Sequence, residues 1–201
     1  ERNLDALCQA VHRSSPLCIN VWIALPYPNP QVFPNDLLRV QATVEWISLF
    51  LDRWSKCSLH SALTLRGFYW LQESMYDQGP TFDDRFVITE VNKRVHSLCA
   101  DGNKLPYQLA NGWDEWKSLG FDLAFLQPNA YFNPERRIED AAASAYLTGM
   151  GVEMEFDLGV TYDQAKRQRF MEYMKAGATG GTDSAGRYFG PYKYESPLAW
   201  Y

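Results

Sequence analysis

The sequence lacks any run of clustered lysine and arginine, and its formal net charge is −5 over 201 residues. Because nucleic-acid phosphates are bound by clustered cations, this absence argues against nucleic acid as a partner. No uninterrupted apolar run is long enough to span a bilayer, so the sequence predicts no membrane-spanning segment. No secretory signal is visible at Glu1, and we expect the natural chain to start upstream of it.

Cysteine and histidine are scarce, with four and three residues. The cysteines form no CxxC pair, which indicates buried free thiols and leaves a disulfide open. The histidines lie far apart along the chain, so we expect no zinc site, and no cofactor is predicted. A Gly-rich phosphate loop is also missing. The residues PYPNP at 26–30 follow the first predicted strand, which argues against a nucleotide-binding sheet.

An acidic strand is the most informative feature that is present. In GVEMEFD, residues 151–157, carboxylates alternate with apolar residues. Alternate side chains of a strand share a face, so Glu153, Glu155 and Asp157 are expected on one face. Helical patterns flank this strand on both sides, as in a parallel sheet covered by helices. Acidic side chains on the inner face of such a strand are costly unless they have a function.

Strand and helix patterns alternate along the whole chain. The predicted strands are 18–27, 63–73, 104–109, 121–127 and 151–157, and a further short strand is expected near 178–182. The predicted helices are 35–54, 82–99, 134–147 and 162–175, with a helical turn or two at 113–119. In the first helix, the apolar stripe is expected to consist of Leu38, Ala42, Trp46, Leu49 and Phe50.

This alternation predicts an α/β fold with a parallel sheet, either doubly wound or closed into a (β/α)8 barrel. The strands end in polar or aromatic residues, which favours the barrel, because the C-terminal strand ends of a barrel form its active-site rim. A complete barrel needs eight strands and about 250 residues. We therefore predict one TIM-barrel-like domain over residues 1–201, incomplete in this chain because its first strands are missing.

A second carboxylate stands at the end of another predicted strand, at Glu73. Glycoside hydrolysis needs two carboxyl groups, about 5–5.5 Å apart in retaining enzymes and about 6.5–9.5 Å apart in inverting ones. Glu155 is the predicted partner of Glu73, because Glu153 lies deeper in the strand and Asp157 lies at the loop. Glu153 and Asp157 are expected to tune the site, or to supply the nucleophile instead.

Aromatic and amide side chains flank the same predicted rim, and aromatic residues make up 15% of the chain. Phenols and amides bind sugar hydroxyls, and flat rings stack on sugars. The predicted substrate-binding residues are Tyr27, Tyr69, Tyr107, Trp113, Gln127, Asn129 and Tyr131. An ordinary explanation stays open for some of them, because Asn favours turns and Trp113 could pack a helix onto the barrel.

Three segments carry a resemblance to a known family. GFYWLQES (67–74), LGFDLAFLQPNAYFN (119–133) and GMGVEMEFD (149–157) resemble, in this order, an uncharacterised bacterial domain-of-unknown-function family, number 4855. The resemblance runs from about residue 20 to residue 194. It implies a (β/α)8 barrel related to glycoside hydrolases, secreted by or attached to the surface of polysaccharide-degrading bacteria.

The resemblance also implies roles for individual residues. Glu73 would end the fourth barrel strand as acid/base, and Glu155, or Glu153, would end the seventh as nucleophile of a retaining mechanism. One departure stands out, because the large clan of retaining glycosidases usually has Asn directly before its acid/base and this chain has Gln72.

The leading interpretation is a glycosidase that cleaves an oligo- or polysaccharide with Glu73 and Glu155. One alternative is a barrel that binds glycan without cleaving it. Another is a hydrolase in which Glu153, Glu155 and Asp157 hold Mg²⁺ or Ca²⁺. In the last alternative the acids only stabilise the barrel, paired with Arg66 or another cation.

Overall fold

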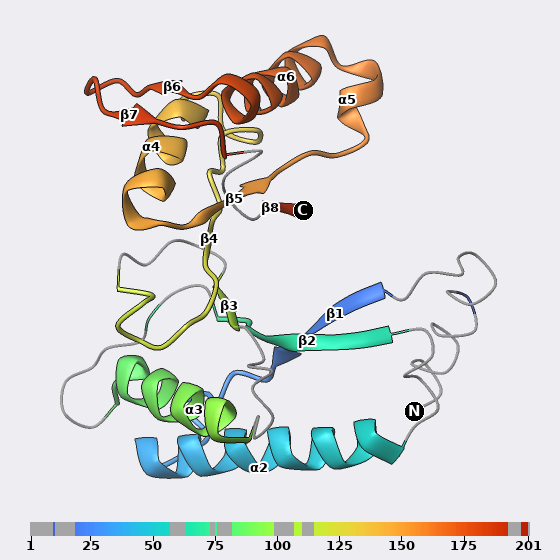
Figure 1. The fold of residues 1–201 in the computed structure, drawn as a ribbon, viewed down its shortest axis with the longest axis vertical. Helices are drawn as coiled ribbons and strands as arrows, with labels where there is room; N and C mark the ends of the chain where they lie inside the picture. Colours follow the sequence, from blue (N-terminus) through green and yellow to red (C-terminus); the bar gives the residue numbers. More distant parts are fainter. Residues whose placement is uncertain are drawn as a thin grey trace. The chain divides into compact units, whose positions relative to one another are not determined.

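The computed structural model describes residues 10, 19–56, 63–72, 75, 82–98, 107–109, 115–192 and 198–200. The chain forms two compact units, Glu1–Tyr107 and Gln108–Tyr201 (Figure 1). Both units mix helices and strands, so the predicted α/β class is confirmed. The sheets are small and none of them closes into a barrel within the described residues.

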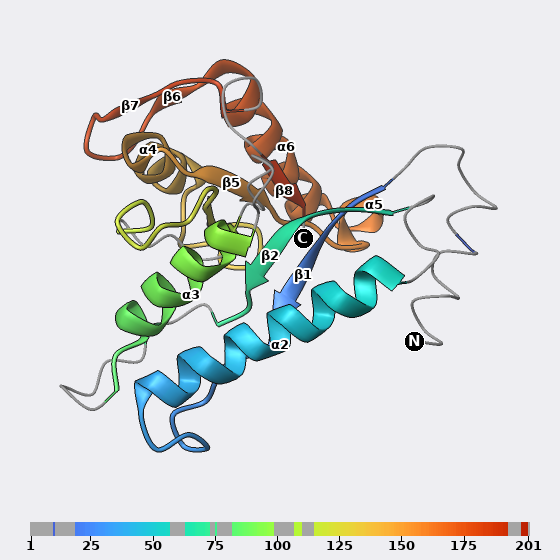
Figure 2. The same cartoon turned by 60° about the horizontal axis from the view of Figure 1, so that its bottom comes forward.

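The first unit is built on two parallel strands covered by two helices. Its elements are β1 (Ile19–Leu25), α2 (Asp36–Lys56), β2 (Leu63–Trp70) and α3 (Asp84–Leu98). β3 (Tyr107–Leu109) begins at the last residue of this unit and is the third strand in the sheet order β1-β2-β3. β1 and β2 pair in parallel, with one irregularity between Val21 and Trp22. The helices α2 and α3 pack side by side (Figure 2). Since parallel strands end at the same edge, residues that follow β1 and β2 are brought to one end of the pair.

The start of α2 is explained by local chemistry. The side chain of Asn35 accepts the backbone N–H of Leu38 at 3.0 Å, which satisfies a donor that the helix cannot pair itself. The buried face of this helix consists of Arg39, Thr43, Ile47 and Trp54. The predicted apolar stripe is therefore wrong in part, because Leu38 and Leu49 are exposed. The buried positions Arg39, Thr43 and Ile47 each lie one residue after a predicted position, and one of them is an arginine.

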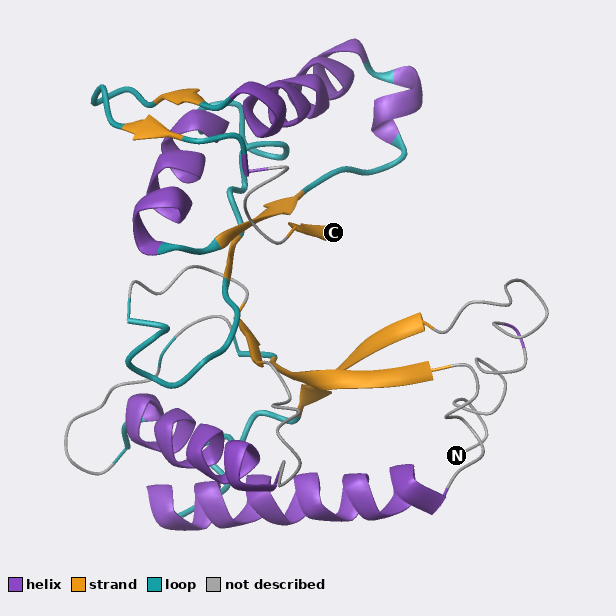
Figure 3. Ribbon diagram, viewed as in Figure 1, coloured by secondary structure: helices purple, strands orange, loops and turns teal. Residues whose placement is uncertain are grey.

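The second unit holds another parallel sheet, in the order β4-β5-β8. Its strands are β4 (Phe125–Leu126), β5 (Gly151–Met154) and β8 (Leu198–Trp200), and its helices are α4 (Ile138–Thr148), α5 (Gly159–Tyr162) and α6 (Gln164–Thr179). Figure 3 shows how short the strands of this unit are beside β1 and β2. β5 pairs in parallel with both β4 and β8, so α4 and α6 lie in two successive crossovers of the sheet.

The further short strand expected near 178–182 is present at the end of that segment, but it does not join the parallel sheet. β6 (Gly181–Thr182) pairs antiparallel with β7 (Tyr188–Phe189) in a hairpin that packs on α4. The turn of the hairpin is closed by Asp183, whose side chain accepts the backbone N–H groups of Ala185 and Arg187. A local turn therefore takes this segment out of the parallel sheet.

The predicted strand 151–157 is longer than the strand in the structure. β5 ends at Met154, so Glu155 and Asp157 lie in the segment that follows it. Asp157 forms a turn instead of a ladder, since its side chain accepts the N–H of Gly159 at 2.7 Å and its carbonyl accepts the N–H of Val160 at 3.1 Å. The three acids therefore do not share one face of one strand.

Among the described residues, no helix combines the length and the apolar character needed to cross a membrane.

Candidate carboxylate site

Glu155 is the first residue after β5, and its side chain is fully buried. One carboxylate oxygen, Oε2, accepts the hydroxyl proton of Tyr173 and lies 3.5 Å from the backbone N of Tyr131. The other oxygen, Oε1, is buried and has no hydrogen-bond partner among the described residues. Buried polar atoms are nearly always paired, so an unpaired carboxylate oxygen at the C-terminal end of a parallel strand marks a candidate functional group.

Tyr173 reaches Glu155 from α6, the helix that follows the carboxylate in sequence. Its hydroxyl oxygen accepts the backbone N–H groups of Ala130 and Tyr131, each at 3.2 Å. Its own carbonyl accepts the hydroxyl of Tyr192 at 2.6 Å. Burial raises the pKa of Tyr173, and the hydrogen bond and charge of Glu155 raise it further. We call Glu155, Tyr173, Ala130 and Tyr131 the Glu155 network.

The loop after β4 is shaped to present these two N–H groups. Asn129 has a φ of 52°, in the left-handed region that Asn tolerates better than most residues. From α6, Arg169 donates to the carbonyl oxygens of Ala130 at 2.7 Å and Pro134 at 2.9 Å, which holds the loop against the helix. Asn129 thus has a conformational role here, while the predicted sugar contact of its exposed side chain stays a prediction.

Asp157 lies beside the Glu155 network and is bound from three sides. Lys166 donates to Oδ2 at 2.5 Å, and Tyr131 Oη and the N–H of Gly159 donate to Oδ1 at 2.9 and 2.7 Å. The hydrogen bond from Lys166 is the largest cause of a lowered pKa of Asp157, with the bond from Tyr131 next. The Lys166 ammonium also lies 5.7 Å from the centre of the Tyr131 ring. The side chains of Asp157 and Lys166 are both partly exposed.

Three aromatic side chains that follow β4 or β5 in the chain are open to solvent. Phe132 is 47% exposed, Phe156 is 42% exposed and Tyr162 is 78% exposed. We call these three residues the exposed aromatic set. Phe132 and Phe156 lie next to Tyr131 and Asp157 in the segments after β4 and β5, and Tyr162 ends α5.

The first unit contains a second buried group of polar side chains, the Arg39 cluster, formed by Tyr27, Asp36, Arg39 and Asp84. Arg39 forms ion pairs with Asp36 at 2.7 Å and with Asp84, and both Arg39 and Asp84 are fully buried. The Tyr27 hydroxyl donates to Asp84, 3.2 and 3.1 Å from its two oxygens. Burial is the largest cause of the raised pKa of Tyr27, followed by the charge of Asp84. The predicted substrate-binding Tyr27 is therefore half-buried against an ion pair.

A family model described as "Domain of unknown function (DUF4855)" matches residues 1–190. The chain belongs to this family. No curated protein and no solved structure matches it.

The other predicted site residues of this DUF4855 chain lie in different places. Glu153 is buried on β5, Tyr69 is half-buried on β2 and Gln127 is half-buried after β4. Tyr107 belongs to β3, but its side chain lies outside the described residues. Glu73 and Trp113 also lie outside them, so the separation of Glu73 from Glu155 stays a prediction.

The three acids of the predicted acidic strand do not form a metal-binding group. Within the described ranges, no three or more His, Cys, Asp or Glu side chains are arranged to hold a metal ion. Glu153, Glu155 and Asp157 all lie within these ranges.

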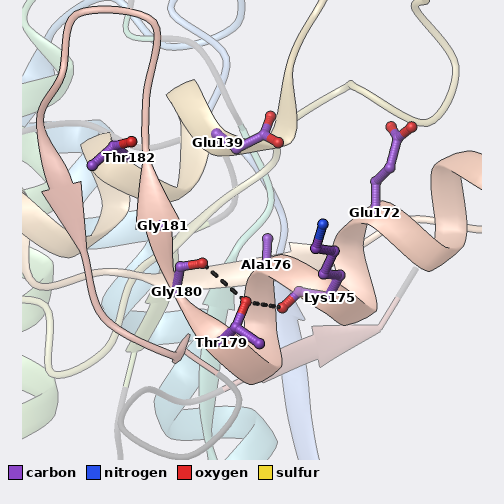
Figure 4. A pocket seen from close by; sticks show the side chains of 8 residues that line it. All are labelled: Glu139, Glu172, Lys175, Ala176, Thr179, Gly180, Gly181 and Thr182. Carbon is purple, nitrogen blue, oxygen red and sulfur yellow. Dashed lines mark hydrogen bonds between the residues drawn. The ribbon is translucent and has the colours of Figure 1, made fainter.

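A polar surface hollow of about 420 Å³ opens elsewhere in the second unit. Figure 4 shows Glu139, Glu172 and Lys175 projecting around it, above the end of α6. None of the predicted site residues lines it. Glu139 also pairs with Arg137 at 3.5 Å, and Glu172 accepts from Gln168 at 3.5 Å, so both acids have partners on their own helices or next to them.

Sequence reasoning missed Tyr173, Arg39 and Asp84. A weak signal existed for Arg39, which lies four residues before Thr43 and eight before Ile47 on the buried helix face. Nothing local marks Tyr173, because an aromatic residue on a helix packs into a core far more often than it binds a carboxylate.

Proposed function

We propose that this DUF4855 chain is part of a glycoside hydrolase-like (β/α)8 barrel that cleaves a glycosidic bond with two carboxylates. Glu155 is the nucleophile and Glu73 the acid/base. The observation that carries the proposal is the Glu155 carboxylate itself, which is held through Oε2 and unpaired at Oε1, directly after a parallel strand. Active sites of parallel barrels are built at such strand ends.

The chemistry follows the retaining scheme. The Glu155 carboxylate attacks the anomeric carbon while the bond to the leaving oxygen breaks. The leaving oxygen keeps the electron pair of the broken bond and takes a proton from Glu73. Water, deprotonated by Glu73, then hydrolyses the covalent bond between the sugar and Glu155. Tyr131 and the exposed aromatic set, which follow β4 and β5 in the chain, would contact the sugar.

The proposal extends to fold and location. The parallel pairing of β1 with β2 and of β5 with β4 and β8 supports the barrel. A bacterial origin and a site of action outside the cell, on polysaccharide, rest only on the resemblance of the three segments quoted above.

The test is hydrolysis of a panel of oligo- and polysaccharides by the protein and two variants, Glu155→Gln and Glu73→Gln. We expect a loss of kcat of about a thousandfold or more for Glu155→Gln, because the neutral amide cannot act as the nucleophile. For Glu73→Gln we expect about 10²–10⁴-fold, the usual contribution of general acid–base catalysis. Glu172→Gln is the matched control, since it makes the same change in the hollow on α6 and should keep full activity. Turnover that survives in Glu155→Gln would contradict the proposal.

A second candidate is a module that binds glycan without cleaving it. The observation that favours it is the exposed aromatic set beside a carboxylate that is fully buried. In this case isothermal titration would detect glycan binding without turnover. Phe156→Ala would weaken this binding, and Glu155→Gln would leave it unchanged.

A further inference from the structure

We propose that Tyr173 is a positioning residue that binds Oε2 of Glu155 and so leaves Oε1 as the oxygen that reacts. The inference rests on the proposed function, since it concerns the carboxylate assigned there as nucleophile. It goes further by naming the reacting atom and the group that selects it. Tyr173 touches no substrate in this assignment and acts only through Glu155.

The hydrogen-bond donors around Tyr173 decide the direction of its bond to Glu155. A phenol oxygen has one proton to donate and can accept two hydrogen bonds. The N–H groups of Ala130 and Tyr131, both at 3.2 Å, approach it as donors. Because a backbone N–H can only donate, the hydroxyl proton of Tyr173 is directed to Oε2 of Glu155. Oε2 is then an acceptor and cannot itself carry a proton toward Tyr173.

The position of Tyr173 is fixed by contacts to the backbone of its own helix, α6. The hydroxyl of Tyr192 holds its carbonyl at 2.6 Å. A Cβ at Gly177 would meet the Tyr192 ring at 2.8 Å, so this ring packs directly on the backbone of α6. Asp163 caps the start of the same helix by accepting the N–H groups of Ala165 and Lys166. The hydroxyl of Tyr173 is therefore presented by a helix that is held at its start and along its length.

This arrangement suits a carboxylate that reacts through one oxygen. Oε1 is buried and has no competing hydrogen bond, so no such bond has to break before it attacks an electrophilic carbon. In the retaining step Oε1 forms the bond to the anomeric carbon, the bond to the leaving oxygen breaks, and Oε2 becomes the carbonyl oxygen of the ester. Tyr173 keeps its hydrogen bond to Oε2 throughout, which fixes the carboxylate plane at the moment of attack.

The first test reads the hydroxyl proton directly by proton NMR and needs no activity. We expect a slowly exchanging downfield hydroxyl signal in the wild type that is absent in Tyr173→Phe. In Glu155→Gln it should move upfield, because a charged acceptor is replaced by a neutral amide. Tyr188→Phe is the control and should keep the signal, since it makes the same change at an exposed tyrosine on β7, outside the Glu155 network.

The outcomes of this test are decisive whether or not the protein is a glycosidase. A downfield hydroxyl signal that persists in Tyr173→Phe, or that is unchanged in Glu155→Gln, overturns the inference. If Tyr173→Phe does not fold, the response of the signal to Glu155→Gln decides alone. A protein that shows the signal but hydrolyses no glycan refutes the proposed function and leaves the Tyr173–Glu155 contact established.

The second test separates positioning from simple stability in an active enzyme. In Tyr173→Phe we expect kcat to fall about 100-fold with KM changed by less than about threefold, as for a misplaced reacting group whose substrate still binds. Tyr188→Phe makes the same change at an exposed tyrosine on β7, outside the Glu155 network, and should retain the wild-type kcat. Equal losses of kcat in the two variants would show that the loss does not depend on the hydrogen bond to Glu155 and would overturn the inference.

Discussion

Two carboxylates are fully buried, Asp84 in the first unit and Glu155 in the second, and they differ in their ion-pair and hydrogen-bond partners. Asp84 pairs with Arg39 and accepts the hydroxyl of Tyr27. Glu155 forms no ion pair among the described residues, and its Oε1 atom is unpaired. A buried charge with a complete set of partners serves the fold, whereas one left incomplete is a cost that function can explain.

The contrast also holds for the groups around each acid. Arg39 uses all three of its nitrogens, because Nε donates to the carbonyl of Pro28 at 2.7 Å while the other two bind Asp36 and Asp84. Burial opposes the charged form of Arg39, but the hydrogen bonds to Asp84 and Asp36 outweigh it and raise the pKa of Arg39. Around Glu155 the donors are a phenol and a backbone N–H, which are neutral.

The largest expected effect comes from breaking the Arg39 cluster. Asp84→Asn keeps the shape of the side chain but leaves the guanidinium of Arg39 with one of its two charged partners. We expect the free energy of unfolding to fall by about 3–5 kcal/mol, the usual result of removing one partner of a buried pair. Urea unfolding followed by tryptophan fluorescence measures it. A loss below about 1 kcal/mol, the range typical of surface pairs, would mean that the pair is not buried in solution.

A smaller loss is expected from the loop that serves Glu155. Asn129 has a φ of 52°, so Asn129→Val should cost about 1–2 kcal/mol for forcing a β-branched residue into the left-handed region. Asn129→Gly, which has no Cβ, should unfold like the wild type. The pair of variants is compared by urea unfolding, and equal stabilities would show that this backbone conformation is not kept in solution.

Glu155→Gln completes the comparison with Asp84→Asn, since both change a buried acid to its amide. Here we expect the free energy of unfolding to stay within about 1 kcal/mol of the wild type or to rise, because no ion pair is broken and a buried charge is removed. The same urea titration measures it. A loss as large as that of Asp84→Asn would place Glu155 among the residues that hold the fold together.

The sequence predicted the long elements well. The predicted helices 35–54, 82–99, 134–147 and 162–175 correspond to α2, α3, α4 and α6, with ends that differ by a few residues. Repeated apolar spacing over many residues gives this signal, and flanking breakers mark the ends. The alternation of acidic and apolar residues at 151–157 continues past Met154, where β5 ends. The residues after Met154 keep this alternation although Asp157 forms a turn there with its side chain, so the sequence pattern alone does not mark the end of the strand.

The site itself could be predicted only in part. The sequence pattern singled out Glu155 near a strand end as a candidate, but nothing in it indicated the contact with Tyr173. The contacts that define each buried acid join distant residues, since Arg39 and Asp84 are 45 positions apart and Ala130 and Tyr173 are 43 apart. No local pattern encodes such pairs. One acid is paired with a cation and the other with a phenol, and this difference became visible only in the folded chain.

The smallest change in the free energy of unfolding is expected at Asp157, which is partly exposed and pairs with Lys166. Its pKa lies below the ordinary 3.8, so it stabilises the fold above that value and loses the contribution as pH falls through the lowered pKa. Asp157→Asn should therefore be less stable than the wild type at neutral pH, and the gap should close in acid. Urea unfolding from roughly pH 3 to pH 7 measures the gap, and salt should narrow it because the pair with Lys166 is open to solvent. Lys166→Met should remove most of the same gap, since Lys166 is the main cause of the shift. A gap that is independent of pH would assign the effect of Asp157 to its turn with Gly159 instead of its charge.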